Sequence, residues 1–309
     1  MIRIEIDLFS GKPNPVWHVP DDLAVELLRT ISENKGMISL SQAPSYILGF
    51  RGLIVTTTDM PDSLRFGLPD TFLLGDGQAP DLQASGDMTR ILLSTCPEAL
   101  IPLTEIISPL MERRTPFLDD HFFGSEAVDE NGPNDVGPSS TTTIQDGKCS
   151  VEVGRYSPAF WNSAQLVSKN NCYSYGCNMR TNDFAQPGVY ANLVFQNTLA
   201  SIITCAKADG AVSQGNCMPQ ARQPRWLMAL VTTADNIGDA FDFHWYRKQQ
   251  EDYWGHKRGY TDATNRDNSG ELIEDPQTCD RGAYTQWGGY FYAPKTMNIK
   301  GRATAIYDR

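Results

Sequence analysis

The sequence contains no long apolar run and no cluster of basic residues. None of its stretches approaches the roughly 18 uninterrupted apolar residues of a membrane-spanning helix, so no transmembrane segment is expected. Its 26 Lys and Arg residues are outnumbered by 37 Asp and Glu residues, which gives a formal net charge of -11. Nucleic acids and anionic membranes are bound by clustered Lys and Arg, so neither is expected as a partner.

The sequence also has few features of export. The N-terminus MIRIEIDLFSG lacks the basic segment and the apolar segment of a secretory signal. We therefore expect a cytoplasmic protein with free thiols, while export by a route without such a signal stays open. Seven cysteines cannot all pair within one chain. Cys205 and Cys217 bracket a polar loop and could form a disulfide in an oxidising compartment; two free thiols are the alternative.

The composition divides the chain into three parts. Residues 1–116 indicate a small α+β domain with few catalytic residue types, which could serve recognition. Residues 117–148 contain seven acids among Gly, Pro, Ser and Thr and predict a flexible linker. Residues 149–309 are rich in aromatic, Asn, Gly and Cys residues. Their helix patterns come first and their strand patterns follow, which is typical of a second α+β domain with an antiparallel sheet.

Hydrophobic periodicity and turn residues place the individual elements. The predicted strands cover 2–8, 53–58, 71–74, 226–233, 240–247, 252–256 and 286–294. The predicted helices cover 21–34, 87–96, 98–113, 189–206 and a short segment after Asn171.

Cys172 stands where a helix is expected to begin. Asn170 or Asn171 can act as the N-cap, because an Asn side chain accepts N–H groups of the first helical turn. A thiol in that turn gains from the helix dipole, which lowers its pKa and favours the nucleophilic thiolate. The sequence therefore predicts Cys172 as a catalytic nucleophile, with an inert buried thiol as the alternative.

Two histidines are candidates for the general base. In a strand over 241–247 the side chains alternate, so Phe241, Phe243 and Trp245 share the core face while Asp242, His244 and Tyr246 share the open face. His244 on the open face can accept a proton from a thiol on a facing helix. His256 lies in the next predicted strand and is expected near His244. We prefer His244 as the base because its strand is more regular, and His256 stays an alternative.

An imidazole base needs a partner that fixes its tautomer. The candidates are Asp267, Asp275, Asn268, Asp242 and Asn265. The stretch 264–276 also matches the first half of a calcium-binding loop, but Pro276 stands where the bidentate Glu is required, and a hairpin turn is the alternative. Cys172, Cys177, His244 and His256 could form a zinc site, although their spacing is not that of the usual ligand pairs.

Several short segments occur in a fixed order, namely NCYSYGCN at 171–178, FAQPG at 184–188, DFHWYR at 242–247, YWGHKRG at 253–259 and DNSG at 267–270. Over roughly residues 160–293 this succession resembles a group of largely uncharacterised bacterial proteins. The opening IEIDLFSGKPNP resembles a recurrent start of bacterial domains. A Cys at a helix start followed by a His on a downstream strand is similar to the papain-like superfamily, including NlpC-type and CHAP peptidases and amidases.

This resemblance implies a papain-like α+β fold and a cysteine hydrolase or acyltransferase that acts on a peptide or a peptide-like amide without a cofactor or metal. Only Cys172 and His244 carry over by role. In this hypothesis Asn171, Tyr173, Tyr246 and Trp254 line the substrate cleft. The alternatives are a non-catalytic binding or toxin-like effector module and a metalloenzyme with Cys and His ligands.

Overall fold

The computed structural model describes residues 1–40, 47–111, 138–144, 149–215, 218–249 and 252–301. The chain forms two compact units. Unit 1 comprises Met1–Phe9 and Pro13–His121, and unit 2 comprises Ser10–Lys12 and Phe122–Arg309. The tripeptide Ser10–Lys12 therefore groups with unit 2, although the residues before and after it group with unit 1. No helix among the described residues is long and apolar enough to cross a membrane.

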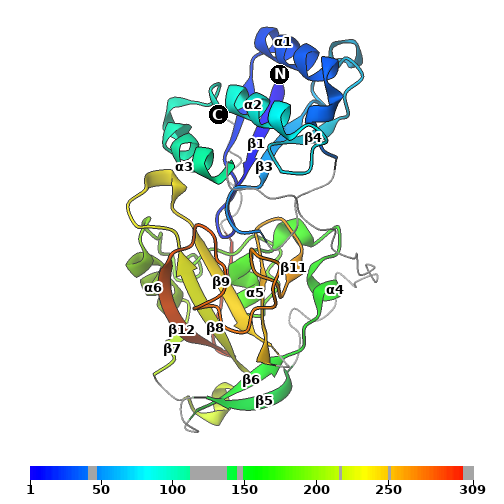
Figure 1. Ribbon diagram of the computed structural model, residues 1–309. Coiled ribbons are helices and arrows are strands. Elements are labelled where there is room, and N and C mark those ends of the chain that lie inside the picture. Colours follow the sequence, from blue (N-terminus) through cyan, green and yellow to red (C-terminus); the bar gives the residue numbers. More distant parts are fainter. Residues whose placement is uncertain (41–46, 112–137, 145–148, 216–217, 250–251, 302–309) are drawn as a thin grey trace. The chain divides into compact units, whose positions relative to one another are not determined.

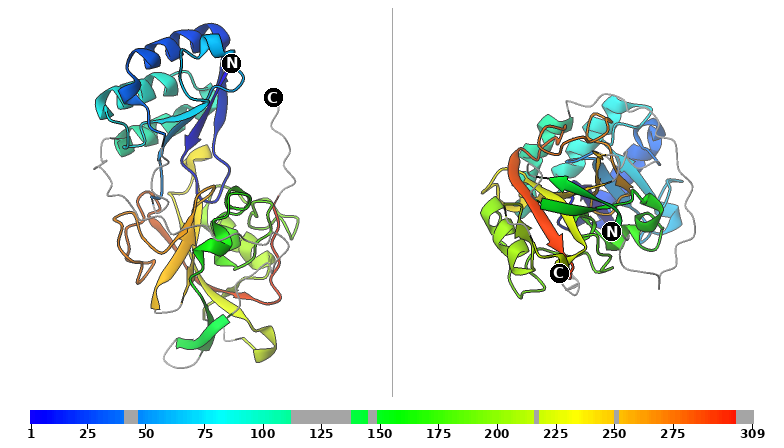
Figure 2. Two further views of the ribbon diagram at one scale, coloured as in Figure 1. Left: turned by 90° about the vertical axis from the view of Figure 1, so that its right-hand side faces the viewer. Right: turned by 90° about the horizontal axis from the view of Figure 1, so that it is seen from below.

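Unit 1 is an antiparallel four-stranded sheet with the order β2-β1-β3-β4. Its helices lie on one side of the sheet (Figure 1, Figure 2). The strands are β1 (Ile2–Asp7), β2 (Val16–Val19), β3 (Gly52–Thr56) and β4 (Thr71–Leu74). The helices are α1 (Asp21–Glu33), α2 (Leu82–Leu93) and α3 (Ile101–Met111).

The alternation predicted at the N-terminus determines the core of unit 1. Ile2, Ile4 and Ile6 are fully buried, whereas Arg3 and Glu5 between them are only partly buried. One face of β1 is thus covered by the helices and the other stays accessible, as the period of two predicts. The α+β character expected for this part is confirmed.

Unit 2 contains an eight-stranded, largely antiparallel sheet whose main path runs β11-β10-β9-β8-β12-β7. β5 pairs with β6, and β6 joins β8 through a parallel pairing of Glu152 with Trp226. The strands are β5 (Pro138–Ile144), β6 (Cys149–Gly154), β7 (Val212–Ser213), β8 (Arg225–Thr232), β9 (Phe243–Lys248), β10 (Trp254–Lys257), β11 (Ala263–Thr264) and β12 (Gln286–Pro294). Its helices are α4 (Pro158–Trp161), α5 (Cys172–Gly176) and α6 (Leu199–Ala208).

The apolar core of unit 2 lies on one face of this sheet. Phe241, Phe243 and Trp245 pack there with Cys172 and Tyr173, which begin α5. The core assignment of the three aromatic residues is therefore confirmed. The opposite face is not open as predicted, because Asp242, His244 and Tyr246 are at most 1% exposed.

Some predicted boundaries are wrong. The helix predicted over 189–206 begins only at Leu199, because Thr198 caps it by accepting the N–H of Ser201 at 3.2 Å and Asn192 has a φ of 58°. Within the predicted linker the Thr-rich run forms β5, since β-branched residues favour pairing with β6. Residues 117–137 and 145–148 of that linker lie outside the described residues.

The thiols also differ from the expectation. Cys149 at the start of β6 is disulfide-bonded, whereas Cys205 in α6 is a buried free thiol. Cys217 lies outside the described residues. The disulfide of Cys205 considered from the sequence does not form.

Candidate functional site

Cys172 is the first residue of α5, as predicted, and Asn171 caps the helix by accepting the N–H groups of Tyr173 and Ser174, both at 3.2 Å. The thiol is nevertheless fully buried, and its sulfur lies 3.7 Å from the carbonyl oxygen of Phe243. Burial raises the pKa of Cys172 well above its ordinary value, and the Asp242 charge acts in the same direction. The expected lowering of the thiol pKa is wrong, because loss of water outweighs the dipole of a five-residue helix.

His244 points away from Cys172. The thiol belongs to the apolar cluster that contains Phe243 and Trp245. Successive side chains of a strand point to opposite faces, so His244, between those two residues in β9, lies on the other face. The structure therefore does not bring the predicted nucleophile and the predicted base together.

The two histidines contact each other instead, as the pairing of β9 with β10 predicts. His244 Nε2 lies 2.7 Å from His256 Nδ1, and His256 Nε2 lies 2.9 Å from the carbonyl oxygen of Arg266. A carbonyl only accepts, so His256 carries its proton on Nε2 and accepts at Nδ1 from His244. Burial lowers the pKa of His256 to about 4. Neutral His256 is held as a hydrogen-bond acceptor by this geometry.

The two predicted orienting carboxylates bind backbone and tyrosine groups rather than histidines. Asp267 accepts the N–H groups of Ser269, Glu271 and Asp280 at 2.9–3.1 Å. Asp275 accepts the hydroxyl of Tyr290 at 2.6 Å and one backbone N–H. The partner that fixes the His256 tautomer is the Arg266 carbonyl, which has no sequence signature.

The four residues expected to line a substrate cleft are buried. Tyr173 donates its hydroxyl to Asp209 at 2.9 Å, and the ring of Trp254 stacks on that of Tyr290 with the centroids 5.5 Å apart. Tyr246 packs edge-on against His244. Their exposed fractions, with that of Asn171, run from 0% to 4%. These side chains hold the unit together rather than lining an accessible surface.

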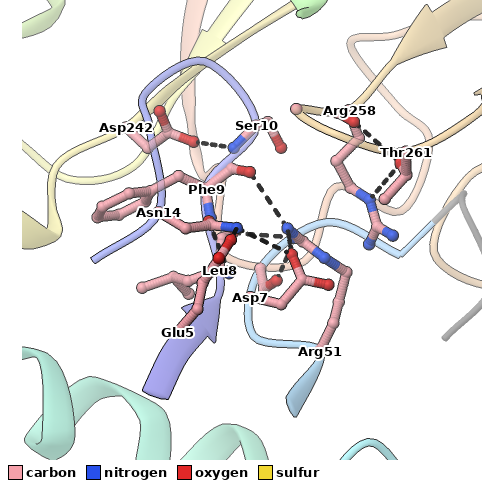
Figure 3. A network of polar contacts seen from close by, with 12 residues as sticks. Glu5, Asp7, Leu8, Phe9, Ser10, Asn14, Arg51, Asp242, Arg258 and Thr261 are labelled. Carbon is pink, nitrogen blue, oxygen red and sulfur yellow. Dashed lines mark hydrogen bonds and ion pairs between the residues drawn. The ribbon is translucent and has the colours of Figure 1, made fainter. Parts of the chain in front are cut away.

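Polar side chains of unit 2 converge on the tripeptide Ser10–Lys12, which itself belongs to this unit. The Asp242 carboxylate accepts the backbone N–H of Ser10 at 2.6 Å, of Gly11 at 3.2 Å and of Lys12 at 3.1 Å (Figure 3 shows the bond to Ser10). The hydroxyl of Tyr284 donates to the same carboxylate. Four donors directed at two oxygens suit the ionised carboxylate, although burial raises the pKa of Asp242.

The carbonyl groups of the tripeptide are bound as well. The Gly11 oxygen accepts from Asn171 Nδ2 at 2.9 Å and from Gln186 Nε2 at 2.7 Å, and the Ser10 oxygen accepts the N–H of Gly259 at 2.9 Å. We call the set Asn171, Gln186, Asp242, Phe243, Gly259 and Tyr284 the Gly11 cradle. Its members come largely from the segments NCYSYGCN, FAQPG, DFHWYR and YWGHKRG, which the fold brings together around this tripeptide.

Gly11 is required by the cradle for steric reasons. A Cβ atom at this position would lie 2.6 Å from Cδ2 of the Phe243 ring, which is closer than real Cβ contacts allow. Phe243 is fully buried in the core and cannot move aside at low cost. Any side chain at position 11 therefore competes with the core of unit 2.

The described residues contain no group of three or more His, Cys, Asp or Glu side chains placed to hold a metal ion. Of the residues considered for zinc, Cys177 lies 3.9 Å from the sulfur of Met297, and Cys172 contacts the Phe243 carbonyl. The Asp267 oxygens considered for calcium are occupied by backbone N–H groups.

Sequence reasoning missed most of the cradle. Gln186, Gly259 and Ser10–Lys12 were not singled out, and Asp242 was considered only as an orienting group. The available signal was the composition of SGKPNP, since a Gly close to two prolines indicates a turn with a special backbone demand.

Comparison with known proteins shows a similarity that covers part of the chain. The chain is 37% identical over 137 residues to insoluble matrix shell protein 1 of Ruditapes philippinarum. The match covers 44% of this chain and 87% of that protein. No family model and no solved structure matches the chain.

We expect Asp242→Asn to lower the free energy of unfolding by about 3 kcal/mol, because an amide nitrogen would then face backbone N–H donors in a buried site. Urea denaturation of the full chain measures this loss. Asp239→Asn is the matched control, since it removes an exposed charge nearby and should change little. Equal effects of the two substitutions would contradict the cradle.

His256 gives the stability of unit 2 a defined pH dependence. The pKa of His256 is 6.5 in the unfolded chain and about 4 in the folded chain. Its contribution to the free energy of unfolding is therefore complete above pH 6.5 and is lost progressively as the pH falls from 6.5 through 4. The loss amounts to about 3 kcal/mol. Buried carboxyls titrate in the same pH range, so the wild type is compared with His256→Gln, which shares them. We expect the difference in the free energy of unfolding between the two proteins to shrink by this amount from pH 7 to pH 4, as measured by urea denaturation. A constant difference would show that His256 does not titrate as stated.

Proposed function

The chain belongs to the family of insoluble matrix shell protein 1, and we propose that it is itself a matrix protein that binds and assembles rather than catalyses. This proposal develops the non-catalytic binding module that the sequence left open. It assigns no reaction to Cys172.

The main support for this proposal is the environment of the Cys172 thiol. A nucleophilic Cys needs an accessible thiolate with a base within hydrogen-bond reach. Cys172 has no exposed surface, its pKa is raised, and its hydrogen-bond partner is the Phe243 carbonyl. His244, the expected base, is engaged with His256 on the other face of the sheet. These observations favour a packing role for the thiol.

The redox state of Cys149 supports a location outside the cytoplasm. Disulfides persist in oxidising compartments and are rare in the cytosol. We therefore propose that the protein acts in an extracellular matrix.

The competing hypothesis is the cysteine hydrolase with a papain-like architecture that the residue order predicts. It requires α5 to move so that Cys172 becomes exposed and reaches an imidazole. Labelling of the native thiols separates the two hypotheses directly.

We expect N-ethylmaleimide to modify Cys172 in the folded chain at least about tenfold more slowly than Cys96, because a buried thiol with a raised pKa supplies little thiolate. Cys96 is the control because it is a free thiol that is only partly buried. Peptide mass spectrometry after short exposures gives both rates. If Cys172 is the first thiol modified, the matrix-protein proposal fails and the hydrolase is favoured.

A further inference from the structure

Unit 2 contains a long span without a charged side chain. Residues 184–206 include no Asp, Glu, Lys, Arg or His, although charged residues make up 20% of the chain. The span belongs to unit 2 and runs into α6 (Figure 1). Three of its large apolar side chains are exposed to water, namely Tyr190 at 49%, Leu193 at 40% and Val194 at 70%. We call these three residues the apolar tip.

The exposure of the apolar tip indicates a contact surface. Single exposed apolar side chains are common on proteins, whereas a group of neighbouring ones marks a site that a partner or a membrane covers. The same span hides its other large apolar residues better, since Ile202 is fully buried and Ile203 is partly buried in α6. Val194 keeps 70% of its area in water, so few neighbours surround it. The tip therefore projects from the surface and does not line a groove.

The apolar tip is held in one conformation by groups beneath it. The buried Asp209 carboxylate accepts the N–H of Gly188 at 2.6 Å and that of Ala191 at 3.3 Å. The N–H of Leu193 donates to the Gly188 carbonyl at 2.8 Å. Next to the tip, the ring of Phe195 packs edge-on against an aromatic ring of the unit 2 core, with the centroids 5.5 Å apart. A partner can thus cover the tip without first ordering the chain.

The charge around the apolar tip limits what can cover it. Two carboxylates contact the uncharged span directly, because Asp235 accepts the N–H of Leu199 at 2.7 Å and Asp209 lies beneath the tip. The chain as a whole carries a formal net charge of -11. An anionic surface is repelled by such a chain. An uncharged apolar surface meets no such opposition, and it requires no charged group from the span.

We propose that the apolar tip inserts into the interface of an uncharged, zwitterionic lipid layer. A protein partner is oriented by polar and charged groups at the rim of the contact, and this span has no charged side chain for that purpose. A lipid layer requires only apolar area and a ring suited to its interface. Leu193 and Val194 supply the area, and Tyr190 places its ring among the lipid chains with its hydroxyl at the headgroups. The inference does not rest on the matrix proposal.

Co-sedimentation of the full chain with phosphatidylcholine vesicles tests the proposal. We expect Leu193→Ser/Val194→Ser to lower the partition coefficient at least about tenfold, because the inserted apolar area is lost. Leu272→Ser is the matched control, since Leu272 is 38% exposed but stands beside the exposed Glu271 and outside the tip. This control should bind as the wild type does. Circular dichroism checks that each variant is folded.

Lipid charge provides a second test that uses the unaltered protein. Replacing part of the phosphatidylcholine by phosphatidylserine should weaken binding, because the chain is acidic, and added salt should restore it. Three results would each overturn the proposal: no binding of the wild type to phosphatidylcholine, binding that the tip substitutions leave unchanged, or binding that requires phosphatidylserine. Modification of Cys172 ahead of Cys96 would instead refute the matrix proposal and would not affect this one.

Discussion

The Asp242 carboxylate is a buried charge that requires hydrogen-bond donors. The groups that donate to it fix the positions of several segments of unit 2. Its partners are three successive backbone N–H groups and the Tyr284 hydroxyl, all of them donors. Asp242 directly precedes β9, so the same contact that binds Ser10–Lys12 also positions Phe243 against Gly11. A buried charge left without partners would cost several kcal/mol, which gives a physical reason for a loop at this place.

Cys172 and His244 lie on opposite faces of β9, although their order along the chain suggests a catalytic pair. Phe243 and Trp245 direct one face toward α5 and Cys172, whereas His244 belongs to the face that carries His256. Both histidine rings are committed to a chain of hydrogen bonds that ends at the Arg266 carbonyl. The order of Cys172 and His244 along the chain is thus compatible with a structural role for each residue.

The parts of the structure that could be predicted rest on local information. The alternation of Ile2, Ile4 and Ile6 predicts β1, the aromatic alternation in β9 predicts its core face, and Asn171 predicts the start of α5. The cradle could not be predicted, because most of its contacts go to backbone atoms of Ser10–Lys12, and backbone groups are the same for nearly all residue types. The pKa of Cys172 was mispredicted for a related reason, since burial is a property of the tertiary structure.

Amide hydrogen exchange at Ser10, Gly11 and Lys12 tests the central claim most directly. Backbone N–H groups bound to a buried carboxylate should open only when unit 2 unfolds, so we predict protection comparable to that of core amides in β8. The N–H of an exposed turn exchanges almost without protection. Rapid exchange of all three amides in the folded protein would contradict the account, because Asp242 would then not accept their N–H groups.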